Sequence, residues 1–455
     1  MATDANDTFN RGIQTFRGTK DYFGDEARWR ISVIETIRKS LELFGFEPLE
    51  TPAIENERTL KGKYGDEGDK KRYRLSLPYP QEAGLRYDQT VPLARFMAMN
   101  WNQFPLPYRR YVIGPVWRDE SVQAGRLRQF YQCDFDTVGS DSPIIDAEVV
   151  AINYTILSKL GFTDTFRVRV NDRRLLDAMA EALGILDPSQ KLALFRAWDK
   201  LEKTSLEAIT QELVLAGLPT KTLRSFSRVT EKLLQLNNQP SDRLLSVLSR
   251  LFKNESVATE IKRLEFLTRS ILDMGVPEIN FAISPLLARG LDYYTGPIFE
   301  TVVEKAGVGS ITGGGRFDKL IADMGGPDLP ASGSSFGLER IMTVMEELGL
   351  KPTSAQSTKV LVTVFDPDSA QLVSRSYQAA SALRLDNVNT EIYTGANRRL
   401  SAQIDIARRK NISLVVIVGP DELSSNTVTV KNLQSKTQST IPFLELSDCV
   451  KTLLA

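Results

Sequence analysis

Two extended runs joined by a short polar connection most constrain the fold of this chain. The runs are YRRYVIGPVWRDE at 108–120 and RQFYQCDFDTVG at 128–139, and SVQAGRL separates them at 121–127. A polar connection that contains Gly, placed between two such runs, predicts a hairpin of two antiparallel strands. Since side chains alternate between the two faces of a strand, residues two apart share one face. The hairpin therefore presents two faces of different chemistry.

One of these faces carries side chains that suit a nucleotide. The planar fork of Arg matches phosphate oxygens, and an exposed Phe can stack on a base. Tyr131, Cys133 and Phe135 point to the opposite face. A solvated sheet face with salt bridges between strands is the alternative, and the charge pattern alone leaves both open. The residues of the candidate face are Arg118, Glu120, Arg128, Phe130, Gln132 and Asp136.

The rest of the chain divides into segments of different character. Apolar residues at three- and four-residue spacing predict an amphipathic helix over Asp25–Phe44, and Gly45 suits its C-cap. Leu-rich helical patterns predict a helical insert, and strands alternating with helices near the C-terminus predict a small α/β domain with a largely parallel sheet. The predicted boundaries are a flexible tail at 1–16, a mixed domain at 17–171 and 277–350, the insert at 172–276, a linker at 351–358 and the α/β domain at 359–455.

The composition excludes several kinds of chemistry. The 455 residues include 57 Lys+Arg, 57 Asp+Glu, 2 Cys and no His. Without His there is no Ser-His-Asp triad, no Cys-His pair and no His-ligated zinc. Two Cys suit a reducing cytosol, so we expect a cytoplasmic protein. No apolar stretch reaches the length that spans a bilayer, so we expect no membrane partner.

Three further segments carry Gly or Arg beside aromatic residues. ARGLDYYTGPIFE at 288–300 predicts a buried strand region that holds Arg289, or simply a hairpin with an aromatic pair. GSITGGGRFDKL at 309–320 predicts either a plain loop or a backbone that approaches a ligand closely. ASGSSFGLER at 331–340 predicts the start of a helix over about 335–348. A Gly-rich helix start can bind an anion, but this feature alone is weak evidence for such a site.

Together these segments resemble the motifs of class II aminoacyl-tRNA synthetases, specifically the histidyl-tRNA synthetase family. WRDE with RLRQFYQCDFD (117–136) resembles the second class motif, GSSFGLER (333–340) the third, and the region around Pro52 the first. ARGLDYYTG and TGGGRFDKL resemble two segments peculiar to the histidine enzyme, and LRYDQTVPLARF (85–96) its amino-acid-binding loop. The YDQTVP and FYQCDFD sequences are similar to those of the eukaryotic-type branch. They have Asp88 and Asp136 where bacterial forms usually have Glu.

The resemblance implies an α/β (α+β) fold. Its parts would be a class II catalytic domain on an antiparallel sheet, a helical insert and a C-terminal α/β anticodon-binding domain. It implies ATP-dependent ligation of L-histidine to tRNA(His) through a histidyl-adenylate, in a homodimer. Mg²⁺ would accompany ATP, with no dedicated protein metal site. The histidine carboxylate would attack the α-phosphorus without help from a base.

The resemblance also implies roles for individual residues. Arg118 and Arg289 would be catalytic. The histidine-binding residues would be Asp88, Gln89, Thr90, Arg118, Gln132, Asp136, Arg289, Tyr293 and Tyr294. The ATP-binding residues would be Arg118, Glu120, Arg128, Phe130 and Arg340. The tRNA-binding residues would be Arg126, Arg398, Arg399, Arg408, Arg409 and Lys410.

Three alternatives remain at this point. The basic residues near the C-terminus could be a solvated helix face, which for any single residue weighs as much as a phosphate contact. The whole chain could be an inactive synthetase-like regulatory or tRNA-binding paralogue, although Arg118, Arg289 and Arg340 are all present. A sister synthetase for Gly, Thr or Pro shares the last domain, but RGLDYYTG argues against it.

Overall fold

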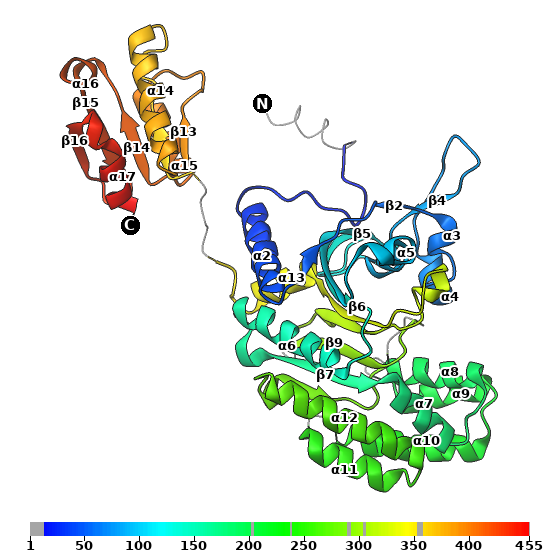
Figure 1. Ribbon diagram of the computed structural model, residues 1–455. Helices are drawn as coiled ribbons and strands as arrows, with labels where there is room; N and C mark the ends of the chain where they lie inside the picture. Colours follow the sequence, from blue (N-terminus) through cyan, green and yellow to red (C-terminus); the bar gives the residue numbers. More distant parts are fainter. Residues whose placement is uncertain are drawn as a thin grey trace, which may run out of the picture. The chain divides into compact units, whose positions relative to one another are not determined.

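The computed structural model describes residues 13–201, 204–236, 239–288, 293–303, 306–352 and 358–454. The chain divides into two compact units, Met1–Lys351 and Pro352–Ala455, and Figure 1 shows the elements of each. Residues 1–12 of the predicted tail and 353–357 of the predicted linker lie outside the described residues. The predicted insert and mixed domain fall within one compact unit, so the boundary between them stays a prediction.

A large mixed sheet organises the first unit. Among the described residues it has eight strands in the order β1-β5-β6-β11-β10-β9-β7-β8. The edge pairs β1/β5 and β7/β8 are parallel and the pairs between them antiparallel. The strands, in sheet order, are β1 (Glu47–Pro48), β5 (Tyr108–Trp117), β6 (Gln129–Val138), β11 (Ala331–Gly337), β10 (Thr312–Arg316), β9 (Pro297–Val303), β7 (Phe166–Asp172) and β8 (Phe281–Ile283).

The predicted hairpin is confirmed. Strands β5 and β6 pair in register from Tyr108 opposite Val138 to Trp117 opposite Gln129. Tyr131, Cys133 and Phe135 point to the face that helices cover, where Cys133 and Phe135 are fully buried and the Tyr131 ring contacts the Arg30 guanidinium. The alternation of side chains along this segment is therefore as the sequence predicts.

Strands run through both glycine-rich segments, which rules out a plain loop at 313–315 and starts the predicted helix later than residue 335. Residues 313–315 lie within β10 rather than in a loop, and 331–337 form β11, so that the following helix, α13 (Leu338–Glu347), begins at Leu338. The reason is crowding at the centre of the sheet. A Cβ atom at Gly314 would lie 2.1 Å from the carbonyl oxygen of Gly333 on the neighbouring strand. Because Gly314 has no Cβ atom, β10 can pair this closely with β11.

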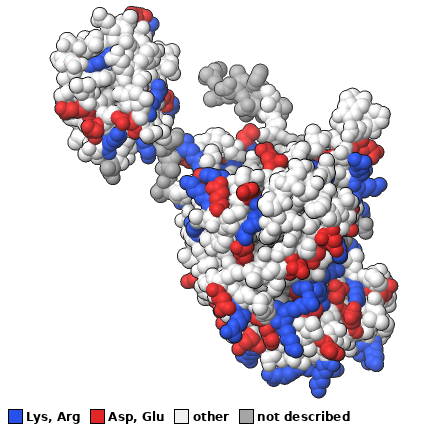
Figure 2. All heavy atoms as spheres, in the orientation of Figure 1, with Lys and Arg blue, Asp and Glu red and all other residues white. Residues whose placement is uncertain are grey.

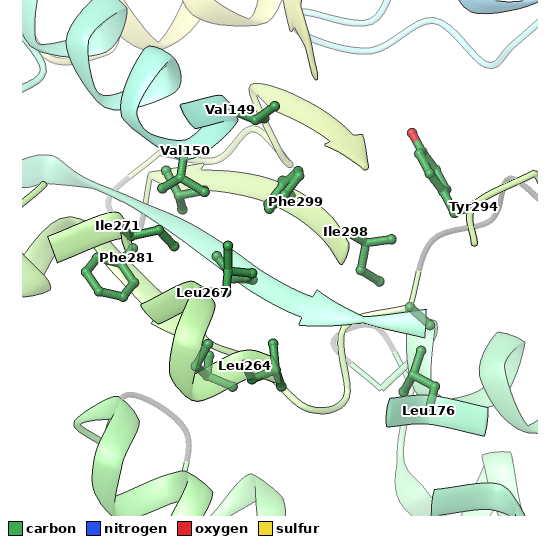
Figure 3. Close-up of a cluster of buried hydrophobic side chains, with 14 of the residues drawn as sticks. Val149, Val150, Leu176, Leu264, Leu267, Ile271, Phe281, Tyr294, Ile298 and Phe299 are labelled. Carbon is green, nitrogen blue, oxygen red and sulfur yellow. The ribbon is translucent and has the colours of Figure 1, made fainter. Parts of the chain in front are cut away.

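Helices cover one face of the large sheet. They are α2 (Gly24–Leu43), α6 (Pro143–Lys159) and α13, and α12 (Glu255–Asp273) packs on α6 and β7. Figure 3 shows Val149 and Val150 of α6 and Phe299 of β9 in one cluster with Leu267 and Ile271 of α12. The helix predicted over 25–44 is confirmed, and Gly45 ends it with a φ of 75°.

The stretch between β7 and β8 is helical. Side chains cap four of its helices, with Asp172, Asp187, Ser205 and Asn254 each accepting a backbone N–H, which stabilises helix starts. Lys and Arg are frequent on its surface, interspersed with Asp and Glu (Figure 2). Besides α12, its helices are α7 (Arg173–Ala182), α8 (Pro188–Asp199), α9 (Leu206–Leu215), α10 (Thr220–Leu234) and α11 (Ser241–Leu251).

A small sheet lies beside the large one. Its strands are β2 (Ile54–Asn56), β4 (Ala83–Leu85) and β3 (Arg74–Leu75), with helices α3 (Glu57–Leu60), α4 (Gly65–Lys70) and α5 (Thr90–Asn100) around it. The Arg86 guanidinium donates to the carbonyls of Pro115 at 2.9 Å and Thr51 at 2.7 Å. The hydrogen bond to Pro115 thereby links the loop between β4 and α5 to the end of β5.

The second unit is the expected α/β domain. Its sheet has the order β13-β12-β14-β15-β16, in which β12, β13 and β14 are parallel and β15 and β16 antiparallel. An apolar core packs against both faces of this sheet. The elements are β12 (Val360–Val362), α14 (Ala370–Leu385), β13 (Thr390–Ile392), α15 (Leu400–Arg409), β14 (Leu414–Ile417), α16 (Pro420–Ser425), β15 (Thr427–Asn432), β16 (Gln438–Pro442) and α17 (Leu446–Leu454).

Candidate active site

A pocket of about 950 Å³, including the part open to solvent, lies on the uncovered face of the large sheet. Its floor is formed by β6, β11 and β10, and the loop before α5, the hairpin connection and the start of α13 form its walls. The structure brings most of the predicted site residues together here. Those that line it are Asp88, Thr90, Arg118, Glu120, Arg126, Phe130, Gln132, Asp136, Tyr293, Tyr294 and Arg340.

Glycines make room for the functional side chains on this floor. A Cβ atom at Gly333 would lie 2.3 Å from Oδ1 of Asp136, and one at Gly315 would lie 2.7 Å from Cδ1 of Tyr294. Both distances are far below van der Waals contact. The carboxylate of Asp136 and the ring of Tyr294 therefore lie directly on the backbone of β11 and β10.

The floor of the pocket is acidic. Asp88, Asp134 and Asp136 are all buried. Burial raises the pKa of Asp136 to about 6 and that of Asp134 to about 7, although Arg110 opposes both shifts. Burial also raises the pKa of Asp88. Three carboxyl groups held in a desolvated pocket favour a ligand that brings hydrogen-bond donors and positive charge.

Sequence reasoning missed Asp134, which lines this floor, and Arg110, which lies outside the pocket lining and pairs with Asp136. Asp134 lies between Gln132 and Asp136 on the same strand face, so the alternation used for its neighbours includes it. Arg110 is directly opposite Asp136 on β5 and is 1% exposed. In the sequence, Arg110 is visible only as a charged residue within an apolar run. That pattern does not distinguish a buried ion pair from an exposed one.

Several buried acceptor atoms on the pocket wall and floor have no hydrogen-bond partner among the described residues, including one of Asp88 and one of Gln132. Asp88 Oδ1 accepts from the Val91 backbone N–H at 3.0 Å and from the Tyr64 hydroxyl at 3.3 Å, while Oδ2 has no partner among the described residues. Gln132 Nε2 donates to Ser335 Oγ at 2.9 Å. The buried Gln132 Oε1 has no hydrogen-bond partner among the described residues. Buried acceptors of this kind are costly unless a ligand satisfies them.

Arginines gather at the mouth of the pocket. The Arg118 guanidinium donates to the carbonyl of Tyr87 at 2.9 Å and lies 5.2 Å from the centre of the Phe130 ring. Arg340 donates to the carbonyl of Ser310 at 2.6 Å. Burial, followed by repulsion from Arg126, lowers the pKa of Arg340. Arg side chains suit phosphate oxygens, and an aromatic ring such as that of Phe130 can stack on a base.

Glu120 and Arg126 form an ion pair at this mouth. Burial raises the pKa of Glu120, but the hydrogen bond from Arg126 and the charge of Arg118 outweigh it, so the pKa is lowered. Glu120 is therefore ionised at neutral pH, and it holds the hairpin connection over the pocket.

Two of the predicted histidine- and ATP-binding residues that the structure describes, Arg128 and Gln89, are not part of the pocket lining. Arg128 pairs with Asp119 at 2.9 Å and donates its backbone N–H to Gly18, so it binds the N-terminal segment. The buried amide of Gln89 lies behind the pocket, where Nε2 would be 3.3 Å from a Cβ atom at Gly114. Arg289 lies outside the described residues.

The basic residues of the second unit form two groups rather than one patch. Arg398 and Arg399 precede the first residue of α15, and Arg408, Arg409 and Lys410 lie at its other end. All five are exposed. Arg398 pairs with Asp368, Arg408 with Asp405 at 2.9 Å and Lys410 with Glu391 at 2.6 Å.

Comparison with known proteins shows the family of this chain. A model of the histidyl-tRNA synthetase family matches residues 18–341, and an anticodon binding domain matches 359–453. The chain belongs to the histidyl-tRNA synthetase family. It is 38% identical to a histidine–tRNA ligase of Gloeobacter violaceus over 94% of this chain and 96% of that protein. It is 37% identical to one of Aeropyrum pernix over 96% and 98%.

Solved structures agree with this family membership. A histidyl-tRNA synthetase from Nostoc sp. PCC 7120 superposes with a TM-score of 0.81 at 28% identity, covering 97% of this chain and 99% of that one. An ATP phosphoribosyltransferase regulatory subunit/histidyl-tRNA synthetase from Bacillus halodurans has a TM-score of 0.72 at 18% identity, covering 88% and 96%. The second likeness shows a shared fold alone.

Two further observations bear on partners. Within the described residues, no three acidic or thiol side chains come together as a candidate metal site. No helix in the same part of the chain is both long and apolar enough to cross a membrane.

Proposed function

We propose that this chain, as a histidine–tRNA ligase, activates L-histidine with ATP in this pocket and transfers the histidyl group to tRNA(His). The observation that carries the proposal is the division of the pocket. Buried acceptors form the floor, and three arginines and the Phe130 ring form the mouth. A cationic amino acid fits the first part and a nucleotide triphosphate the second, with their reacting atoms between them.

Histidine would bind at the acidic floor. Its α-ammonium group would donate to Asp88 Oδ2, Thr90 and Gln132 Oε1, of which the first and last are buried acceptors without partners in the described residues. Its imidazole would lie on Asp136 and Tyr294, whose side chains lie directly on the strand backbone at Gly333 and Gly315. The Tyr293 ring, 4.8 Å from that of Tyr294, would support it. Gln89 would act indirectly, through Arg110. The Arg110 guanidinium donates to the main-chain carbonyl of Gln89 at 3.1 Å.

ATP would occupy the mouth. Its adenine would stack on Phe130 with its edge at Glu120, and Arg340 would face the terminal phosphates. Arg118 would contact both the α-phosphate and the histidine carboxylate. Arg289 would neutralise the α-phosphate from the other side, a role that rests on the sequence resemblance. Mg²⁺ would enter with ATP as part of the substrate.

The chemistry requires no general base. The histidine carboxylate is already ionised and attacks the α-phosphorus in line, forming the mixed anhydride and releasing pyrophosphate. The terminal adenosine of the tRNA then attacks the adenylate carbonyl, and AMP leaves. The protein contributes orientation and positive charge where charge develops on phosphate. The absence of His from the chain is therefore no obstacle.

The tRNA would contact both units. The hairpin connection with Arg126 would meet the acceptor end. The second unit, 359–455, would bind the anticodon, with the basic groups at the two ends of α15 as phosphate contacts. Within the first unit, 17–171 and 277–350 would form the catalytic domain and 172–276 an insertion domain. We place the enzyme in the cytoplasm, where the free Cys133 and Cys449 would remain reduced.

The protein would act as a homodimer. Large apolar side chains just after Pro52 and at the end of α5 are exposed, namely Ile54 (54%), Met99 (69%) and Trp101 (42%). Contiguous exposed apolar surface is typical of an interface. A closed contact between identical surfaces about a two-fold axis is the commonest arrangement of such an interface.

One experiment tests the proposed activity. ATP–pyrophosphate exchange is measured with each of the twenty amino acids in turn, followed by aminoacylation of tRNA(His). We expect exchange with histidine alone and stable charging of that tRNA. Exchange with none of the amino acids would support the inactive paralogue, and exchange with glycine, threonine or proline would support a sister synthetase.

A further inference from the structure

Glu339 lines the pocket, but none of the roles above uses it. Its buried carboxylate accepts hydrogen bonds from two other elements. Oε1 accepts from the Arg30 guanidinium of α2 at 2.7 Å, and Oε2 accepts from the backbone N–H of Tyr131 on β6 at 2.9 Å. This one carboxylate of α13 therefore links α13 to both α2 and β6.

The link to Tyr131 lies where the β6/β11 ladder ends. β11 ends at Gly337, and α13 begins at the next residue. Beyond that point the Glu339 carboxylate accepts the backbone N–H of β6. Tyr131 directly follows Phe130 in the chain, and Arg340 directly follows Glu339. The hydrogen bond therefore joins the neighbours of two residues that are assigned to ATP.

Arg30 contacts both β6 and α13 beside this link. It is 7% exposed, and its guanidinium lies 4.5 Å from the centre of the Tyr131 ring and 4.2 Å from that of Tyr22. Nη1 also lies 4.0 Å from the sulfur of Met342, which is one turn along α13 from Glu339. A cation is attracted to the face of an aromatic ring, and a buried carboxylate is costly without a compensating cation. Arg30 therefore bridges the two elements and compensates the charge between them.

We propose that Arg30 is a positioning residue for the nucleotide, which acts through Glu339 to set the spacing between the Phe130 ring and Arg340. A base and a triphosphate that are held by one rigid frame reinforce each other, because binding of the first places the second at its partner. AMP lacks the β- and γ-phosphates, so it gains less from this spacing than ATP does. The inference rests on the proposed function, since it deepens the assignment of the nucleotide subsite.

The test compares ATP with AMP on the full-length protein in the absence of histidine. Dissociation constants for both are measured by calorimetry with Mg²⁺ present. The ratio of the AMP constant to the ATP constant reports how well base and phosphates are bound together. Arg30→Met keeps a long apolar side chain but removes the guanidinium. We expect the ratio to fall about tenfold, with AMP binding nearly as before.

A double variant provides the test if the uncompensated carboxylate prevents Arg30→Met from folding. Arg30→Met combined with Glu339→Gln removes both charges, so neither is left buried without its partner. Because the two residues act as one unit, the ratio should fall as in Arg30→Met and no further. A normal ratio in the double variant would overturn the inference. A further fall would also overturn it, since Glu339 would then act independently of Arg30.

Arg38→Met is the matched control, because Arg38 lies on the same helix and pairs with Glu35 through side chains that are 36% and 41% exposed. It should leave the ratio unchanged, and a comparable fall there would contradict a specific role of Arg30. Equal losses of ATP and AMP affinity in Arg30→Met would mean a merely structural role and would contradict the inference as well. If the unaltered protein binds neither nucleotide, the proposed function itself is refuted.

Discussion

The guanidinium of Arg110 lies 2.6 Å from Oδ2 of Asp136, and both side chains are almost fully buried. The two residues are direct partners across the β5/β6 ladder. A buried carboxylate is tolerated when a cation compensates it, and removing one partner of such a pair leaves an uncompensated charge. Arg110 thus keeps Asp136 available as an acceptor while burial draws its pKa upward.

Arg110→Met should destabilise the protein strongly. Loss of the buried partner is expected to lower the free energy of unfolding by about 3–5 kcal/mol, measured by urea denaturation. Arg109→Met is the matched control, because Arg109 is the adjacent residue of β5 and its pair with Glu148 is about a quarter exposed. That variant should lose much less. Equal losses in the two variants would contradict the importance of the buried pair.

Asp136→Asn should impair histidine binding more than ATP binding. The carboxylate can accept from an imidazole N–H, whereas an amide can present a donor that is left unpaired. We expect the KM for histidine in pyrophosphate exchange to rise tenfold or more, with the KM for ATP changing about twofold at most. A parallel rise in both constants would show that Asp136 does not belong to the amino-acid subsite.

Gly315→Ala should damage the pocket although it adds a single methyl group. Its Cβ atom would lie 2.7 Å from both the Tyr294 ring and the carbonyl oxygen of Pro297. The ring would have to leave its place on β10, so histidine affinity should fall about tenfold or more, together with a lower melting temperature. Gly307→Ala is the control, because nothing lies within 4 Å of a Cβ atom at that position. Normal histidine binding in Gly315→Ala would contradict the assigned position of Tyr294.

Asp134→Asn should stabilise the substrate-free protein at alkaline pH. The pKa of Asp134 is about 7 in the folded state and about 3.9 when unfolded. Between these values folding takes up a proton, so ionisation costs stability that grows from about pH 4 and is complete above about pH 7. Asparagine avoids this cost.

The melting-temperature gain of Asp134→Asn should therefore be larger at pH 8 than at pH 5. The measurement is a thermal melt of the substrate-free protein at both values. Asp141→Asn replaces an exposed carboxylate and should give no comparable gain at either pH. A gain that is the same at pH 5 and pH 8 would refute the effect of burial on Asp134.

The protein should sediment as a dimer at twice the chain mass of 50.9 kDa. Met99→Asp should weaken the dimer, because Met99 is 69% exposed on α5 and a charge placed in an apolar interface is costly. Leu215→Asp is the control, since Leu215 is 89% exposed on α9 of the helical stretch. A fully active monomer would refute the proposed dimer.

The alternation along β6 shows how far local reasoning reaches. It predicted that Phe130, Gln132 and Asp136 share a face, because every extended strand alternates its side chains. Arg128 departs from this pattern because it precedes the first residue of β6 and pairs with Asp119. The helix over 25–44 and the alternation of strand and helix in the second unit were predictable for the same reason, since their periodicity depends on neighbours in the sequence.

Only the tertiary structure decided which of these faces became the pocket. Asp88, Tyr294 and Arg340 are far apart in the chain, and the order of β6, β11 and β10 in the sheet brings them around one cavity. The glycines of β10 and β11 lie in strands whose neighbours approach too closely for a Cβ atom. Arg110 can be buried because Asp136 lies opposite it and compensates its charge. Burial, strand register and close approach are relations between distant segments, so periodicity and composition determined the elements and the residue types, while packing determined the site.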